Sequence, residues 1–228
     1  MLSNICRSIV LGRNIPREFI EFMIQSYNDY RMYLKQDALA MGRKLEGNLL
    51  GRMKLCFFKD QIWEFLVVLR KVEYIKNVEL NSPRWLVKKL GQFKYVYYLH
   101  RFRSISIKCG FSIPPNTFGP GLSIAHYGTI IVNPNTRVGA NCRLHACVNI
   151  GASGGSLKAP IIGDNVYIGP SAVIFGDIMI ADNVTIGANA TVNKSFFQQN
   201  IVIAGTPAKV LKTNSQNWLQ FNGVNLCR

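Results

Sequence analysis

Hydrophobic residues return at every sixth position in the second half of the chain. Between Pro160 and Asn193 the repeating aliphatic residues are Ile162, Ile168, Ile174, Ile180, Ile186 and Val192. Two places before each of them stands another small or β-branched residue, and glycine follows three of them. No α-helix or ordinary strand has this period, whereas a parallel β-helix makes each flat side of a triangular coil from one six-residue unit. The period therefore predicts a parallel β-helix.

The same frame extends towards the N-terminus and fails in two places. Further inward positions are occupied by Ile150, Leu144, Val138 and Val132. Ser156 is the first failure, because it is polar at an inward position. The second lies after Phe118 and Ile124, since the next inward residue, Val132, comes eight places after Ile124 rather than six. We therefore expect two extra residues to bulge out within the segment HYGTIIV, which begins at His126.

The first half of the chain has a helical period instead. Apolar residues at steps of three and four predict an amphipathic helix over about residues 15–41. Asp60 is a suitable N-cap for a second helix over Asp60–Ile75. Ser82 followed by Pro83, at the first helical position, predicts the start of a third helix that ends at Gly110. The patterns together predict an α+β protein with an α-helical domain (1–110), a parallel β-helix domain (111–210) and a C-terminal tail (211–228).

Composition places the chain among soluble globular proteins. Hydrophobic residues make up 48% of the chain and charged residues 17%, and no apolar run approaches the ~20 residues that would span a bilayer. The N-terminal segment lacks the long apolar core of a signal peptide. We therefore expect a cytoplasmic protein.

The net charge of +15 is concentrated in the helical half. Residues 1–110 hold 20 of the 27 Lys and Arg residues and 9 of the 12 Asp and Glu residues. The segment WLVKKLGQFKYVYYLHRFRSISIK interleaves basic and aromatic residues, a pattern found in helices at membrane surfaces and in nucleic-acid-binding proteins. We favour a helix that buries its aromatic residues against the neck of the β-helix. Contact with the inner face of the membrane is the alternative, and we do not expect nucleic-acid binding.

Neither the cysteines nor the histidines predict a metal site. The six cysteines contain no C-x-x-C pair and no zinc-like spacing. Cys142 occupies a small-residue position of the β-helix frame, so we expect a buried free thiol there. His126 and His145 have no third ligand of a suitable type nearby.

Two of the three histidines fall on one edge of the predicted prism. His126 lies two places after Ile124, near a corner, so its ring should point outside the packed interior. With coils of about 18 residues, His145 lies one place beyond the residue stacked on His126, at the ~4.8 Å strand spacing. A histidine with an ordinary pKa of ~6.5 is largely neutral near pH 7 and can act as a general base. The alternative interpretation is that both are simple surface histidines.

At this point the sequence resembles a known family. Residues 111–210 are similar to the hexapeptide-repeat acyltransferases, and within them to the branch of serine acetyltransferase and the O-acetyltransferases of capsule and lipopolysaccharide synthesis. The segments that carry the resemblance are IPPNTFGPGLSIAHYGTIIVNP, VGANCRLHACVNIG, IGDNVYIGPSAVIFGDIMIADNVTIGANATV and AGTPAKV. The resemblance implies a left-handed β-helix, acetyl-CoA as acyl donor, no metal, and a homotrimer or a dimer of trimers.

The resemblance also implies the roles of particular residues. The family's catalytic histidine falls on His126, which would take the proton from an acceptor hydroxyl so that the alkoxide attacks the thioester directly; His145 is a second candidate catalytic residue. Backbone N–H groups would stabilise the oxyanion. Acetyl-CoA would lie in the groove between neighbouring β-helices of a trimer, against Gly151, Ala152, Gly169, Pro170 and Ala188. Lys209 would meet the CoA phosphates, and a solvated tail lysine is the alternative for it.

Three departures from serine acetyltransferase cluster where serine would bind. Ala125 replaces an Asp, Phe111 or Ser112 stands where an orienting Asp would fall, and Ala159 before Pro160 replaces a second histidine. The loop ASGGSLKAP is also shorter. We therefore expect an O-acetyltransferase that acts on a sugar hydroxyl in surface-polysaccharide biosynthesis. The alternatives are serine O-acetyltransferase of cysteine biosynthesis and a catalytically silent β-helix scaffold.

Overall fold

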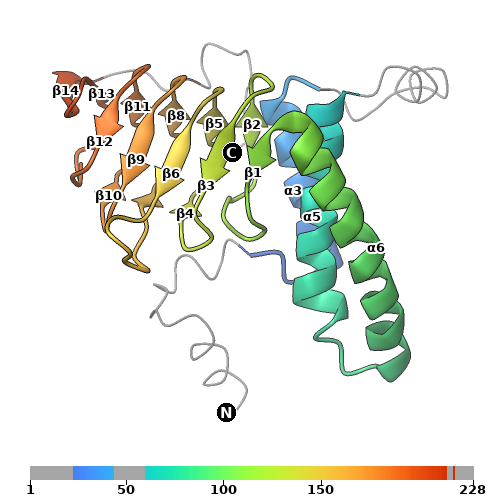
Figure 1. Ribbon diagram of the computed structural model, residues 1–228. Helices are drawn as coiled ribbons and strands as arrows, with labels where there is room; N and C mark the ends of the chain where they lie inside the picture. The colour runs from blue at the N-terminus through green and yellow to red at the C-terminus, as the bar shows by residue number, and fades with distance from the viewer. Residues whose placement is uncertain (1–22, 44–59, 215–217, 219–228) are drawn as a thin grey trace.

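The computed structural model describes residues 23–43, 60–214 and 218. Within these residues the chain forms helices first and strands afterwards, so the predicted α+β class is confirmed (Figure 1). The helical end consists of α3 (Tyr27–Ala40), α5 (Gln61–Tyr74), the π-helical turn η1 (Ile75–Glu79) and α6 (Trp85–Cys109). The part of the first predicted helix before residue 23 lies outside the described residues.

In the described part of the chain the strands form three sheets. The first contains β1 (Phe111–Ser112), β3 (Ile130–Val132), β6 (Asn149–Gly151), β9 (Val173–Phe175) and β12 (Thr191–Val192). The second contains β4 (Arg137–Val138), β7 (Ile161–Ile162) and β10 (Met179–Ile180). The third contains β2 (Ser123–Ile124), β5 (Arg143–Leu144), β8 (Tyr167–Ile168), β11 (Thr185–Ile186), β13 (Val202–Ala204) and β14 (Lys209–Lys212). Paired strands are parallel except β13 and β14. The chain thus winds into the expected left-handed parallel β-helix.

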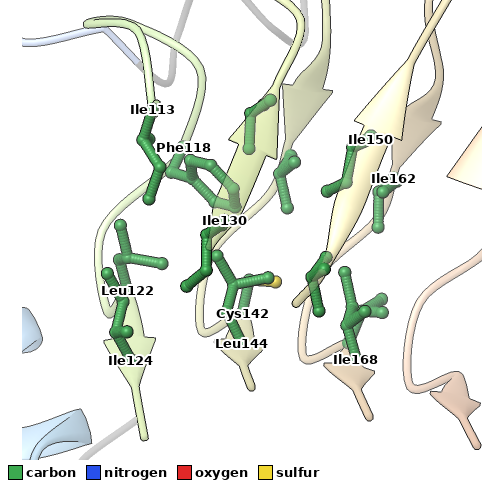
Figure 2. Packing of buried hydrophobic residues seen from close by; sticks show 14 of the residues in the cluster. Ile113, Phe118, Leu122, Ile124, Ile130, Cys142, Leu144, Ile150, Ile162 and Ile168 are labelled. Carbon is green, nitrogen blue, oxygen red and sulfur yellow. The ribbon is translucent and has the colours of Figure 1, made fainter. Parts of the chain in front are cut away.

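The predicted inward residues form the interior of this β-helix. Each of these residues is at most 3% exposed: Ile162, Ile168, Ile174, Ile180, Ile186, Val192, Ile150, Leu144, Val138 and Val132. Figure 2 shows Leu144, Ile150 and Ile168 turned into this interior. Cys142 is buried among them as a free thiol, as predicted. Because each buried aliphatic side chain contributes about 1.5–3 kcal/mol, the stacking of coils is driven by these columns.

Asparagines make one corner of the coils possible. Asn141, Asn165 and Asn183 have positive φ angles of 56°, 58° and 58°. Asparagine tolerates this left-handed conformation better than most residues. The Asn141 side chain donates to that of Asn165 (3.0 Å), which donates to that of Asn183 (3.1 Å). This ladder joins successive coils along the axis and keeps the corners aligned.

The two failures of the period are two places where the coil lengthens. Ile131 pairs with Asn149 at the regular spacing of three six-residue units, whereas the pairing of Ile124 with Leu144 is longer by two positions. The two extra residues therefore lie between β2 and β3, as predicted. The pairing of Leu144 with Ile168 exceeds the regular spacing by a whole six-residue unit, which is looped out. Ser156 belongs to this exposed loop rather than to the prism.

The helices agree with their predicted ends, with two corrections. The first predicted helix begins only at Tyr27, because Ser26 is extended and its hydroxyl caps the helix by accepting from the Asp29 N–H (3.1 Å), so residues 23–26 are not helical. The Asp60 carboxylate accepts hydrogen bonds from the N–H groups of Ile62 (2.9 Å) and Trp63 (3.2 Å) at the start of α5. Helix α6 begins at Trp85 and not at Pro83, because Arg84 is extended (φ -78°, ψ 113°) and serves as the N-cap residue. The Ser82 hydroxyl accepts from the Arg84 N–H (3.3 Å) in the turn before it. The helix ends as predicted at Gly110, with φ of 79°.

A further correction concerns the aromatic residues of α6, which we expected to be buried. Phe102 is buried near the C-terminal end of the helix, where α6 joins the β-helix core. Tyr95 and Tyr98 pack partly buried against the same core. The aromatic residues Trp85, Phe93 and Tyr97 are exposed instead. The physical reason is that α6 lies at the outside of the helical end, where only one of its faces packs on α5 (Figure 1).

One hydrophobic cluster joins the helical end to the β-helix. The ring of Phe65 in α5 lies 5.6 Å from that of Phe102 and 5.1 Å from that of Phe111, measured between centroids. The division into domains at residue 110 stays a prediction. At the other end, β13 closes the last coil by pairing Ile203 with Ile186, and the chain then reverses into β14.

Candidate functional site

The structure brings His126 and His145 together at one edge of the β-helix. His126 lies in the bulge between β2 and β3 and is exposed, and His145 directly follows β5 and is partly buried. Their ring centroids are 5.8 Å apart, at an interplanar angle of 54°. The Ala125 N–H donates to the Leu144 carbonyl (2.9 Å), so His145 stacks beside Ala125. It therefore lies one place before the residue stacked on His126, and not one place beyond it, because this coil contains the two extra residues.

His145 has an unpartnered buried nitrogen. Its Nε2 is buried and has no hydrogen-bond partner among the described residues. The ring lies 5.0 Å from that of Tyr167, between centroids. Burial lowers the pKa of His145, and the nearby charges of Arg143 and His126 lower it further, so the ring is neutral near pH 7. Buried polar atoms in proteins nearly always have a partner, so Nε2 marks a position where a ligand can complete the hydrogen bonding.

The ring of His126 has no hydrogen-bond partner in the part of the chain that the structure describes; its ring contact is with His145. The two positions that would hold an orienting Asp lie on β1, where Phe111 is buried and Ser112 is exposed. Neither carries a carboxylate. Among the described residues, the side chain in a position to orient the His126 ring is therefore that of His145.

Aromatic and cationic residues surround this edge. Trp218 packs near Ala40 and Tyr167, and its Nε1 donates to the Asn141 carbonyl (3.1 Å). The Arg143 guanidinium lies 5.6 Å from the centroid of the Trp218 ring. Tyr127, next to His126, is exposed. The sequence pattern left the role of Trp218 unassigned, and a tryptophan within a polar segment was the signal for this contact.

Three of the predicted donor-site residues follow His145 along the same corner. The His145 N–H donates to the carbonyl of Ile168 (3.2 Å), directly before Gly169 and Pro170. A Cβ on Gly169 would lie 2.8 Å from the nitrogen of Ala188 on the next coil, so only glycine fits there. Gly169 is buried and lets the coils pack closely, whereas Pro170 and Ala188 are exposed small residues that an extended ligand can lie against.

The remaining predicted donor-site residues lie elsewhere. Gly151 and Ala152 are at the end of β6 in the first sheet, which is a different corner of the prism. Lys209 is exposed in β14, where it pairs with Ala204 at the end of β13. Because β13 follows β11 in the third sheet, Lys209 stands at the far end of the His145 corner.

The long loop 152–158 sits beside Gly151 and is largely exposed. The Asn135 side chain donates to the Leu157 carbonyl (2.8 Å), and Lys158 forms an ion pair with Asp177. Ala159, where the resemblance placed a second histidine, is fully buried. A histidine at the position of Ala159 would not fit this packing.

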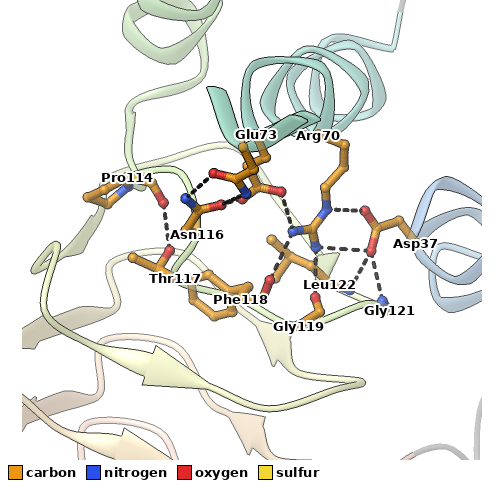
Figure 3. A network of polar contacts seen from close by, with 11 residues as sticks. Asp37, Arg70, Glu73, Pro114, Asn116, Thr117, Phe118, Gly119, Gly121 and Leu122 are labelled. Atoms are coloured by element: carbon orange, nitrogen blue, oxygen red, sulfur yellow. Dashed lines mark hydrogen bonds and ion pairs between the residues drawn. The ribbon is translucent and has the colours of Figure 1, made fainter. Parts of the chain in front are cut away.

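A buried ionic cluster, which the sequence did not predict, supports the segment before His126 (Figure 3). Arg70 in α5 is fully buried. It donates to the carboxylates of Asp37 (2.8 Å) and Glu73 (3.0 Å) and to the carbonyls of Phe118 (2.9 Å) and Gly119 (2.7 Å). The guanidinium therefore connects two helices to the first coil. Its signal in the sequence was an arginine within the apolar run LVVLRKV.

The two carboxylates of this cluster hold the same coil by its N–H groups. Asp37 Oδ1 accepts from the backbone N–H groups of Gly121 and Leu122, both at 2.8 Å, and Glu73 Oε1 accepts from that of Asn116 (2.7 Å). Burial would lower the pKa of Arg70, but the charges of Asp37 and Glu73 outweigh it and raise that pKa. Arg70 thus stays charged, and the turn 116–122 that leads into β2 is fixed.

Comparison with known proteins agrees with this architecture. Residues 159–194 match the family model "Bacterial transferase hexapeptide (six repeats)". Serine acetyltransferase from Brucella abortus strain S19 superposes with a TM-score of 0.61 and 22% identity, over 87% of this chain and 75% of that one. Serine acetyltransferase from Neisseria gonorrhoeae superposes with a TM-score of 0.60 and 24% identity, over 92% of this chain and 77% of that one. The soybean serine acetyltransferase apoenzyme superposes with a TM-score of 0.61 and 20% identity, over 81% of this chain and 69% of that one. The protein has the fold of the serine acetyltransferases.

This hexapeptide-repeat protein matches no curated protein in sequence. The expected resemblance to the hexapeptide-repeat acyltransferases, on the serine acetyltransferase side, is confirmed for the repeat and for the fold. These superpositions include part of the helical end as well as the β-helix, because 87% and 92% of this chain are more residues than 111–210 contain.

Proposed function

We propose that the protein is an acetyl-CoA-dependent O-acetyltransferase in which His126 is the general base. The observation that carries the proposal is the His126–His145 pair at an irregular edge of the β-helix. The fold of the serine acetyltransferases supports the same enzyme class. A rigid post that exposes a histidine at a bulge is a suitable support for proton transfer.

The proposed reaction is a direct transfer. His126 takes the proton of the acceptor hydroxyl, and the oxygen attacks the thioester carbonyl of acetyl-CoA. Backbone N–H groups stabilise the oxyanion, an interaction typically worth about 3–4 kcal/mol. The tetrahedral intermediate expels the CoA thiolate, which receives the proton from His126 to give free CoA and the acetyl ester. His145, kept neutral by its lowered pKa, is proposed to orient His126 or the acceptor.

The donor is proposed to lie between two copies of the chain in a trimer. Gly169, Pro170 and Ala188 lie at the His145 corner, whereas Gly151 and Ala152 lie at another corner. One copy alone therefore does not bring the two groups into one groove, but neighbouring prisms packed about a three-fold axis can. Lys209, at the far end of the His145 corner, is proposed to meet the CoA phosphates.

The proposed acceptor is a sugar hydroxyl of a surface-polysaccharide precursor. The residues Ala125, Ser112 and Ala159 stand where the resemblance places the groups that bind serine or orient the base. Tyr167, which is partly exposed beside His145, offers a ring that can stack on a sugar, and Arg143 offers a cation for a phosphate of an activated precursor. The second candidate is serine O-acetylation in cysteine biosynthesis, which the names of the structural neighbours favour.

An acceptor assay separates the two candidates. The purified full chain is incubated with acetyl-CoA and either L-serine or a panel of nucleotide-linked and lipid-linked sugars, while release of free CoA is followed. We expect turnover with a sugar that exceeds turnover with serine. Rapid turnover on serine alone would show that the sugar assignment is wrong, and absence of CoA release with every acceptor would favour the scaffold alternative.

The proposed location is the cytoplasm, where acetyl-CoA is available. None of the described helices is both long and apolar enough to cross a membrane.

A further inference from the structure

The outer face of α6 has an exposed heptad pattern. Residues spaced alternately by four and three form one line along the helix: Leu86, Leu90, Phe93, Tyr97, His100, Ser104 and Ile107. All seven are exposed. Phe93 is 76% exposed and Ile107 is 82% exposed. A stripe of large apolar residues at this spacing is ordinarily buried against something.

The charges on α6 restrict what that partner can be. The helix contains six Lys and Arg residues and no Asp or Glu. Lys94 pairs with Glu79 and Arg101 with Glu64, along the side that faces η1 and α5. Four further basic residues have no ion pair within the described residues: Lys88, Lys89, Arg103 and Lys108. Of these, Lys89, Arg103 and Lys108 lie within or beside the apolar arc, so the outer face is cationic as well as apolar.

A second copy of α6 is a poor occupant of this face. In a coiled coil the positions that flank the apolar line carry the charges that select the partner. Here the charged flanking positions are Lys89, Lys94, Arg101, Arg103 and Lys108. Two copies would place cations against cations in either orientation. Charge complementarity thus favours an anionic partner.

The width of the apolar face favours a surface over a single acidic helix. Trp85 (67% exposed) and Val96 (69% exposed) lie beside the heptad line and extend it. At 100° per residue, the apolar residues span an arc of about 140°. A partner helix would leave Trp85 outside the contact, whereas a bilayer interface would cover it. Tryptophan and tyrosine are enriched at that interface, and lysine can extend its charge from it towards the lipid headgroups.

We propose that the outer face of α6, defined by Trp85, Leu86, Leu90, Phe93, Val96, Tyr97 and Ile107 with its flanking lysines and arginines, docks in the plane of an anionic lipid bilayer. The face lies on the helical end and uses none of the residues of the His126 edge. The inference therefore holds or fails independently of the proposed acetyl transfer.

Vesicle co-sedimentation of the full chain tests this docking. Vesicles of phosphatidylcholine alone are compared with vesicles in which one third of the lipid is phosphatidylglycerol. We expect binding to the anionic vesicles and little to the neutral ones. Added salt should weaken the binding, because exposed charges are screened. Equal binding to both compositions would overturn the anionic assignment, and no binding to either would overturn the proposal.

Two pairs of variants locate the contact. Phe93→Glu should weaken binding at least about tenfold through lost apolar burial. Its control is Phe197→Glu, which changes a similarly exposed phenylalanine (74%) on the β-helix and should leave binding unchanged. The double variant Lys89→Gln/Arg103→Gln should weaken binding about tenfold to thirtyfold. The control double variant Arg31→Gln/Lys35→Gln removes the same charge from α3.

Each variant pair has an outcome that contradicts the proposal. Equal weakening by the two charge doubles would show that net charge alone, and not α6, drives binding. Equal weakening by Phe93→Glu and Phe197→Glu would show that the apolar contact is not made by α6. Light scattering after gel filtration without lipid provides the remaining comparison. If Phe93→Glu alone lowers the molecular mass of the assembly, this face joins copies of the chain, and the bilayer assignment is wrong.

Discussion

His126 and His145 are neighbours with unlike surroundings. His126 is exposed, so its ring can reach a substrate, and the ring has no hydrogen-bond partner among the described residues. The partly buried ring of His145 keeps one nitrogen unpartnered. An accessible base beside a neutral ring suits a division of work in which one residue moves the proton and the other sets its direction.

The first prediction concerns His126. His126→Ala should lower turnover about 10²–10⁴-fold, because the acceptor hydroxyl loses its base, while the fold stays intact. Steady-state CoA release checks the rate, and circular dichroism checks the fold. His145→Ala should cost less than His126→Ala, and His100→Ala, which removes an exposed histidine of α6, should cost nothing. A near-normal rate for His126→Ala would rule out His126 as the base.

A second prediction at this scale follows from the lowered pKa of His145. Between that lowered pKa and about 6.5 the unfolded chain binds more protons than the folded one. The free energy of unfolding should therefore rise with pH up to about 6.5. The stability that the neutral His145 ring provides should be lost as the pH falls through that range. His145→Gln removes it, so urea unfolding from pH 5 to pH 7.5 should show a smaller pH slope than in the wild type. His100→Gln is the control, and equal slopes for all three proteins would refute the prediction.

Among the secondary-structure elements, the contact between the helices and the first coil depends on the buried cluster at Arg70. Helices α3 and α5 each contribute a carboxylate, and both carboxylates accept backbone N–H groups of the turn 116–122. The cluster thus replaces the hydrogen bonds that a preceding coil would have supplied. It fixes the start of β2 and, shortly after Leu122, the position of His126.

The third prediction tests this cluster. Arg70→Met leaves Asp37 and Glu73 buried without their cation and should lower the free energy of unfolding by about 3–5 kcal/mol. Chemical denaturation measures the change. Arg31→Met, on the exposed face of α3, is the matched control and should change stability by less than about 0.5 kcal/mol. A loss below about 1 kcal/mol for Arg70→Met would show that the ions contribute little.

The elements differ in how well the sequence predicts them. The inward columns were predictable because a buried aliphatic residue returns with a fixed period, and both lengthened coils appeared as breaks in it. The extra length of the coil at Ile124 was not counted when His145 was placed, which shifted it by two positions. The partners of Arg70 were out of reach, because those contacts join residues 33 and 48 positions apart. The exposed face of α6 depends on what packs beside it, which a helical period alone does not specify.

At the scale of the whole molecule, the helices and the candidate site share one end of the post. The His126 edge belongs to the first coils, directly beside α3 and α5, while Lys209 stands at the opposite end (Figure 1). If α6 rests on a bilayer as proposed, the candidate site is held close to that surface and the donor corner leads away from it. Such an arrangement would favour acceptors carried by the membrane over freely diffusing ones.

The regular coils also act as a ruler. Between β8 and β12 the coil repeats at the regular spacing of 18 residues, as in the pairings of Ile168 with Ile186 and of Ile174 with Val192, with an axial rise of about 4.8 Å. Removing or adding one complete coil in this region would preserve every inward column and every asparagine corner. The distance between His145 and Lys209 would then change in steps of one strand spacing. The number of repeats therefore determines how long a ligand must be to reach both residues.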